Sequence, residues 1–214
     1  MSETKAEHPI LFSGPMVKAI LEDRKTMTRR VIKNPGRFEG LMLDGEAGEW
    51  CPYGNVGQRL WVREQWTLSD YSTAAKDRDA VWYRADKAGA IFDCEHRKLK
   101  GQPRLALKDD LNAIIWTPAI YMPRWASRIT LEITDVQVER LQDISEQDIA
   151  AEGLAVTPGT PCATAFVDLP RDKRIHSTAT ACFAAGWNAL NTKHGWKQNP
   201  FVWVISFKRI KVKG

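Results

Sequence analysis

Apolar residues at helical spacing predict three helices along the chain. The first follows Ser13, which is placed to cap it, and has Pro15 in its first turn. The second runs from Ser145 to Gly153, where a serine followed three residues later by an aspartate forms a variant of the capping box and a glycine ends the helix. The third covers about residues 178–192, with a predicted buried stripe of Phe183, Trp187 and Leu190.

The other apolar segments predict strands. Leu60–Thr67 and Ala80–Arg84 are rich in aromatic and β-branched residues. Apolar positions alternate over residues 129–138 with one change of parity, which predicts a β-bulge at Thr134–Asp135. Residues 201–208 are apolar on both faces for most of their length, which is typical of a central or barrel-forming strand. Short strands and few helices favour an α+β domain, a small β-barrel flanked by short helices with sizeable loop insertions.

Length and composition predict a single domain. In a chain of 214 residues with 43% hydrophobic residues and nine tryptophans, we expect one domain over residues 9–214 after a polar tail at 1–8. Insertions are expected at about 34–55, 68–120 and 155–177. The sequence shows no secretory signal and no apolar run of about 18 residues, so we expect a cytoplasmic monomer without membrane contact. The four cysteines lack the spacing of metal ligands, so we expect no metal and no cofactor.

The charged residues are unevenly distributed. The net charge of +5 suits a polyanion, a nucleotide or simply a solvated surface. Cations concentrate in residues 24–37 and carboxylates in residues 132–152. The fold could therefore bring the two segments together, either in a site or in ordinary salt bridges.

The octapeptide Asp23–Arg30 is the densest polar segment. Lys25 and Thr28 lie three residues apart at the expected junction between a helix and a strand, so their side chains can point into one cleft. Arg24 and Lys25 also carry the charge that a helix C-terminus favours. A binding site and a simple helix end are therefore both open at this point.

The octapeptide resembles the G-x-K-x-x-T-x-R signature of ASCH domains, a branch of the PUA-like β-barrel superfamily. Asp23 stands where the family usually has glycine. Three further segments resemble the family in the expected order: Gly57–Arg63, Ser145–Gly153 and Trp203–Phe207. The chain looks most similar to the longer ASCH proteins of phage and prophage genomes.

This resemblance implies binding of RNA, single-stranded DNA or a modified nucleoside. One branch of the family comprises amidohydrolases that remove the acetyl group of N4-acetylcytidine, and its lysine, threonine and glutamate correspond by position to Lys25, Thr28 and Glu152. In that interpretation Thr28 attacks the carbonyl, Lys25 with a lowered pKa acts as the base, and Glu152 passes the proton to the leaving nitrogen. Arg30 would orient the substrate or Glu152. The alternative is a structural Lys25–Glu152 ion pair with Thr28 at a strand end.

Other polar segments offer further candidates for nucleic-acid binding. Arg63 could contact a phosphate and Trp66 could stack on a base. The remaining candidates are Arg24, Arg124, Arg128 and Asn199. Together they leave two further functions open beside amide hydrolysis: a non-catalytic RNA- or DNA-binding module of phage origin, and a ribonuclease.

Overall fold

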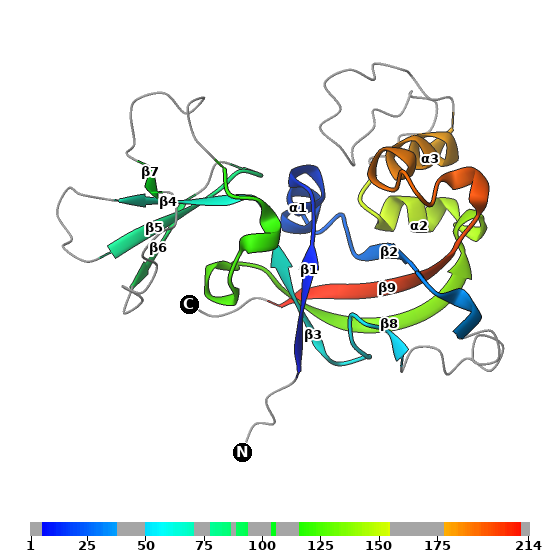
Figure 1. Cartoon of the computed structure of the whole chain (residues 1–214), viewed down its shortest axis with the longest axis horizontal. Coiled ribbons are helices and arrows are strands. Elements are labelled where there is room, and N and C mark those ends of the chain that lie inside the picture. Colours follow the sequence, from blue (N-terminus) through cyan, green and yellow to red (C-terminus); the bar gives the residue numbers. More distant parts are fainter. Residues whose placement is uncertain are drawn as a thin grey trace.

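The computed structural model has an α+β architecture built on two sheets (Figure 1). It describes residues 6–37, 50–70, 78–86, 89–93, 104–105, 116–154 and 178–210. The strands are β1 (Glu7–Leu11), β2 (Met27–Val31), β3 (Arg59–Arg63), β4 (Trp66–Asp70), β5 (Arg78–Tyr83), β6 (Gly89–Asp93), β7 (Arg104–Leu105), β8 (Thr130–Arg140) and β9 (Phe201–Ile210). The helices are α1 (Gly14–Leu21), α2 (Glu146–Ala151) and α3 (Ala179–Leu190), and 3₁₀ turns lie at Pro35–Arg37, Ala119–Tyr121, Arg124–Ala126, Leu141–Asp143 and Trp196–Gln198.

The main sheet is mixed, with the strand order β1-β3-β8-β9-β2. Only β1 and β3 pair in parallel; the other neighbours are antiparallel. The register between β8 and β9 shifts between Ile133 and Asp135, which confirms the predicted bulge. β9 lies inside the sheet, as its two apolar faces predicted. Trp203 and Ile205 belong to one buried cluster, and Val202 and Val204 belong to another.

The predicted closed barrel is not found in the described residues. β1 and β2 form the two edges of the main sheet, and no ladder joins them there. β1 stops at Leu11 because the chain turns into α1 immediately afterwards, so it does not run alongside β2. One guanidinium crosses the gap: Nη2 of Arg30 in β2 donates to the carbonyl oxygen of Leu11 at 2.6 Å. The α+β class is confirmed, and the main sheet is open between its edge strands β1 and β2. We call the gap between these two strands the seam.

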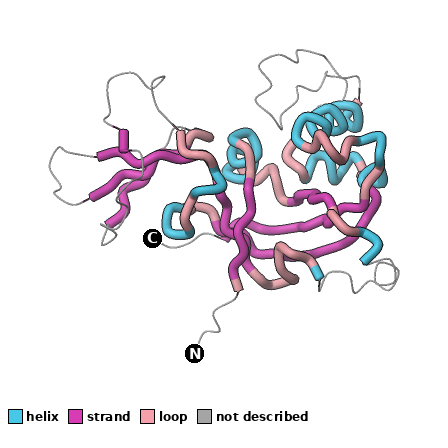
Figure 2. Tube along the Cα trace, viewed as in Figure 1, coloured by secondary structure: helices cyan, strands magenta, loops and turns pink. Residues whose placement is uncertain are grey.

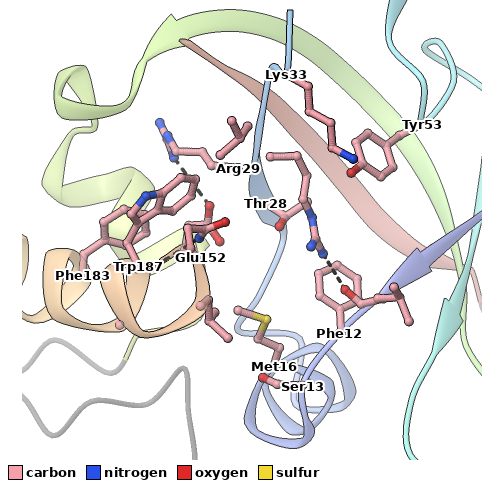
Figure 3. Close-up of a pocket in the computed structure, with 16 residues that line it drawn as sticks. Phe12, Ser13, Met16, Thr28, Arg29, Lys33, Tyr53, Glu152, Phe183 and Trp187 are labelled. Atoms are coloured by element: carbon pink, nitrogen blue, oxygen red, sulfur yellow. Dashed lines mark hydrogen bonds and ion pairs between the residues drawn. The ribbon is translucent and has the colours of Figure 1, made fainter. Parts of the chain in front are cut away.

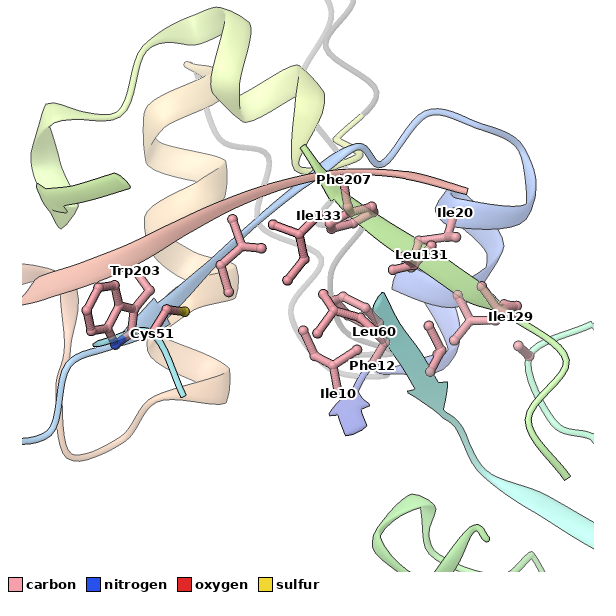
Figure 4. Packing of buried hydrophobic residues seen from close by; sticks show 14 of the residues in the cluster. Ile10, Phe12, Ile20, Cys51, Leu60, Ile129, Leu131, Ile133, Trp203 and Phe207 are labelled. Carbon is pink, nitrogen blue, oxygen red and sulfur yellow. The ribbon is translucent and has the colours of Figure 1, made fainter. Parts of the chain in front are cut away.

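Helices cover the main sheet (Figure 2). They pack against it through two hydrophobic clusters. Val17 and Ile20 of α1 pack into the cluster drawn in Figure 4, with residues of β1, β3, β8 and β9. α2 and α3 contribute to the second cluster with Ile149 and Phe183. Leu190, predicted to be part of the buried stripe, is 46% exposed because it is the last residue of α3.

The four-stranded sheet has the order β6-β5-β4-β7 and lies at the end of the molecule away from α2 and α3 (Figure 1). The strand predicted at Leu60–Thr67 is therefore two strands in two sheets. The break falls at Glu64, whose buried carboxylate pairs with Arg128 at 2.9 Å. The strand predicted at Ala80–Arg84 corresponds to β5.

The structure tests the predicted N-terminal tail but not the predicted loop at 155–177. The polar tail predicted for residues 1–8 is wrong for its last two residues, because Glu7 and His8 already pair with β3. The loop predicted at 155–177 lies outside the described residues. Within the described part, no helix is long and apolar enough to cross a membrane.

Candidate functional site

A tight turn after α1 places Lys25 inside the molecule. Asp23 has a φ of 56°, the left-handed conformation that aspartate tolerates better than most residues. This explains how aspartate can stand where the ASCH signature has glycine. The main-chain N–H groups of Arg24 and Lys25 both donate to the carbonyl oxygen of Ala19, at 2.8 and 3.0 Å. The chain therefore reverses sharply, and the side chain of Lys25 enters the protein with 0% exposure.

Lys25 and Glu152 form a buried ion pair. The Lys25 ammonium donates to Oε2 of Glu152 at 2.5 Å, to the carbonyl oxygen of Glu152 at 3.0 Å and to that of Met27 at 2.8 Å. All three of its N–H bonds thus have acceptors. Gly153 permits this approach: its φ is 95°, and a Cβ atom there would lie 3.0 Å from Cβ of Lys25. The structure brings Lys25 and Glu152 together, as the resemblance to ASCH domains implied.

Burial lowers the pKa of Lys25 below its ordinary value. The loss of solvent around the ammonium is the main cause; Glu152 opposes it, and the nearby Arg30 and Arg29 add to it. Arg24, the neighbour of Lys25 in the chain, is not among these causes; its side chain is exposed and forms an ion pair with Glu22. Within the site, desolvation therefore favours the neutral amine, while the adjacent carboxylate favours the ammonium.

Arg29 anchors the acidic side of the site and was missed by the sequence reasoning. Its side chain is fully buried and contacts Asp148 at 2.9 Å, Glu139 at 3.0 Å and Oε1 of Glu152 at 3.9 Å. Side chains alternate along β2, so Arg29 and Arg30 point to opposite faces of the sheet. The sequence could therefore have predicted that the two arginines have different partners. Which face holds the carboxylates depends on the packing of α2, which the local sequence does not show.

A pocket of about 440 Å³ lies at the seam between β1 and β2. Its size falls within the usual range of small-molecule sites, about 300–1,000 Å³. Thr28 and Glu152 both line it, and Figure 3 shows their polar ends pointing toward one another. Oε1 of Glu152 is buried and has no hydrogen-bond partner among the described residues. Its capacity to accept a hydrogen bond is therefore not used by the described residues.

The walls of the pocket are largely apolar. Phe183 and Trp187 of α3 line one side, with their rings 6.1 Å apart and an interplanar angle of 26°. Phe12 and Met16 line the side nearest α1 (Figure 3). The sequence reasoning placed Phe183 and Trp187 in the buried stripe of α3, and their second role at the pocket had no local signal. Such walls suit a flat, partly apolar ligand.

Main-chain groups of β2 also face the pocket. Hydrogen bonds to β9 bind both ends of the strand, from Phe207 N to Thr26 O at 2.8 Å and from Ile32 N to Phe201 O at 3.0 Å. Alternate residues of an edge strand direct their N–H and C=O groups away from the neighbouring strand. This register therefore turns the main-chain N–H of Arg29 toward the open edge of the sheet.

Several predicted binding residues lie away from the pocket. Trp66 is 1% exposed in the core of the four-stranded sheet, so it cannot stack on a base. Arg63 lies over the ring of Trp61 at 4.5 Å, and Arg124 binds Glu7 at 2.6 Å. None of these three residues lines the pocket that holds Thr28 and Glu152.

Arg24, Arg128 and Asn199 also have structural partners outside the pocket. Arg24 donates to the carbonyl oxygen of Gly153 at 2.7 Å. Arg128 is held by Glu64 and Asp86 at 2.9 and 2.7 Å. Asn199 has a φ of 43° and closes the turn before β9, where its side-chain oxygen accepts a hydrogen bond from a main-chain N–H. None of these three lines the pocket.

Searches of protein-family models, curated proteins and solved structures gave no match to this chain. The similarity to ASCH domains therefore rests on its short matching segments. The function has to be argued from the geometry of the pocket.

Proposed function

We propose that this protein is an ASCH-like amidohydrolase that binds an N4-acylated cytidine in the pocket at the seam and cleaves its exocyclic amide. The observation that carries the proposal is Oε1 of Glu152, a buried carboxylate oxygen without a hydrogen-bond partner among the described residues, in a pocket that Thr28 also lines. A buried acceptor left unpaired costs about 1–3 kcal/mol, so a ligand that supplies a donor is favoured there. The amide N–H of an N4-acylated cytidine is such a donor.

Thr28 is the nucleophile in this proposal. Its hydroxyl oxygen forms a bond with the acyl carbon while Glu152 accepts the hydroxyl proton. The bond between the acyl carbon and N4 then breaks, and Glu152 returns the proton to the departing amino group. Water hydrolyses the resulting acyl ester, which releases the carboxylic acid and restores Thr28. The main-chain N–H of Arg29 at the open edge is the donor for the oxyanion.

Lys25 acts through Glu152 in this scheme. Its three N–H bonds are all occupied, and it is not among the residues that line the pocket. It is therefore a positioning residue, which fixes one oxygen of Glu152 and leaves the other for the substrate. This differs from the role of direct base that the family resemblance implied.

The test is incubation of the pure protein with N4-acetylcytidine, with cytidine and acetate measured by chromatography and mass spectrometry. We expect Thr28→Val to lower kcat by at least about 100-fold, because the isosteric side chain lacks the hydroxyl. Thr26→Val is the matched control, since Thr26 is exposed and belongs to the same octapeptide. It should retain the rate of the unmodified protein, and both variants should unfold at the same denaturant concentration as that protein.

Two results would contradict the proposal. One is the absence of cytidine release by the unmodified protein, which would leave Lys25 and Glu152 as a structural ion pair or as part of a binding module. The other is a Thr28→Val variant that hydrolyses the substrate at the original rate, which would remove Thr28 as the nucleophile.

A further inference from the structure

Arg30 is a cation without a carboxylate partner in the described part of the protein. It differs in this from Arg29, its neighbour in β2, which contacts carboxylates of Glu139, Asp148 and Glu152. The Arg30 guanidinium instead donates to the carbonyl oxygen of Leu11 and lies over the ring of Phe12 at 5.1 Å. Its Nε atom is buried and has no hydrogen-bond partner among the described residues. Burial of a cation without a counter-ion is costly, so an anion beside it would be stabilising.

Two further donors line the pocket close to Arg30. The Arg30 guanidinium lies 6.0 Å from the ring centre of Tyr53. Lys33 is exposed, and within the described residues no carboxylate pairs with it. Figure 3 shows the side chains of Lys33 and Tyr53 pointing toward one another, on the side of Thr28 that lies away from Glu152 and the aromatic wall. A guanidinium, an ammonium and a phenol therefore gather at one end of the pocket.

We propose that Arg30, Lys33 and Tyr53 bind a phosphate group of the ligand, so that the protein prefers a nucleotide to a free nucleoside. A tetrahedral oxyanion accepts hydrogen bonds from several directions, and a planar guanidinium beside an ammonium matches this need. Burial lowers the pKa of Arg30, Tyr53 and Glu152 partly oppose this effect, and a bound anion would oppose it further. The identity of the base rests on the proposed function, whereas the phosphate subsite rests on these three side chains.

The experiment measures binding by isothermal titration calorimetry, with cytidine, cytidine 5′-monophosphate, inorganic phosphate and a short cytidine oligoribonucleotide as probes. We expect the monophosphate to bind the unmodified protein at least about tenfold more tightly than cytidine, from one to two charge-assisted hydrogen bonds. This ratio should fall to about one in a Lys33→Ala/Tyr53→Phe double variant. Lys18→Ala is the charge-matched control, because Lys18 is exposed on α1 and lies outside the pocket, and it should keep the ratio.

The oligoribonucleotide distinguishes two sources of the same phosphate. Binding as tight as that of the monophosphate places the phosphate within a strand, and binding of the monophosphate alone places it on a free nucleotide; both outcomes support the subsite. Equal affinity for cytidine and its monophosphate would overturn it. So would a ratio that survives in the double variant, or a failure of both the monophosphate and inorganic phosphate to bind.

The result is separable from that for amide hydrolysis. A nucleotide preference without cytidine release from N4-acetylcytidine would keep the phosphate subsite and remove the proposed reaction. Cytidine release without a nucleotide preference would do the opposite.

Discussion

Replacing Lys25 by methionine should destabilise the protein strongly because it leaves Glu152 buried without its partner. The substitution keeps the length of the side chain but removes three hydrogen bonds, including the 2.5 Å contact with Oε2 of Glu152. The carboxylate is only 4% exposed, and its other oxygen already lacks a hydrogen bond within the described residues. Loss of one partner from a buried ion pair costs about 3–5 kcal/mol. The nearby guanidinium of Arg29, 3.9 Å from Oε1, favours a value near the lower limit.

A double-mutant cycle separates this pair from the rest of the fold. Urea unfolding is followed by tryptophan fluorescence and by circular dichroism for the unmodified protein, Lys25→Met, Glu152→Gln and the double variant. Because glutamine carries no charge, the double variant should lose less stability than the two single variants added together, with a coupling energy of about 2 kcal/mol. Lys33→Met is the control for loss of a lysine, and should change stability by less than about 0.5 kcal/mol, because Lys33 is exposed.

A Lys25→Met variant that loses less than about 1 kcal/mol, or a coupling energy of about zero, would contradict a buried Lys25–Glu152 pair. Either result would mean that the two side chains do not share a buried environment. The carboxylate would then have no fixed orientation toward the pocket, and the proposed chemistry would lose its basis.

Two further predictions concern the surroundings of the site. Gly153→Ala should cost about 3 kcal/mol in urea unfolding, because at a φ of 95° the added Cβ atom would lie 2.9 Å from Cβ of Ala19 and 3.0 Å from Cβ of Lys25. Gly57→Ala, with a φ of 83° in open space, should cost only the backbone part, and equal costs would contradict the crowding. The hydrogen bond from Arg124 holds the pKa of Glu7 below its ordinary value, so the stability that this carboxylate contributes is complete above that ordinary value and is lost as pH falls through the lowered one. Thermal unfolding should therefore show Glu7→Gln to be less stable than the unmodified protein at about pH 7 and equal to it at about pH 2, and a difference that grows with acid would contradict the sign.

Local signals predicted the elements that hold Glu152. The capping box at Ser145 forms with both of its hydrogen bonds, because a serine and an aspartate three residues apart can satisfy the first turn of α2 without help from the rest of the chain. The bulge after Ile133 was also readable, since a change in the parity of apolar positions requires an extra residue. These features depend on neighbours in sequence, and this is why they could be predicted.

Features that depend on distant pairing were not readable. The segment from Leu60 to Thr67 has uniform strand propensity, so nothing local marks the break that sends Trp66 into the core of a second sheet. Lys33 and Tyr53 follow no periodic pattern in the sequence. Both line the pocket at the seam, and the local sequence gives no sign of this. The charge distribution indicated only that their two segments could meet, and the family resemblance named Lys25 and Glu152 as the pair. The two residues lie far apart in the chain and meet at an isolated bridge.

The open seam between β1 and β2 accounts for the polar atoms that the largely apolar pocket contains. A closed ladder would pair the outward main-chain groups of β2 with β1. Instead the seam is spanned by Arg30, and buried atoms of opposite charge, Oε1 of Glu152 and Nε of Arg30, have no hydrogen-bond partner within the described part. Each such atom costs about 1–3 kcal/mol in a dry interior. A ligand that relieves both must carry a hydrogen-bond donor at one end and an anion at the other. An N4-acylated cytidine nucleotide has this arrangement, with its amide N–H and its phosphate on opposite sides of a flat ring that the aromatic wall of α3 can cover.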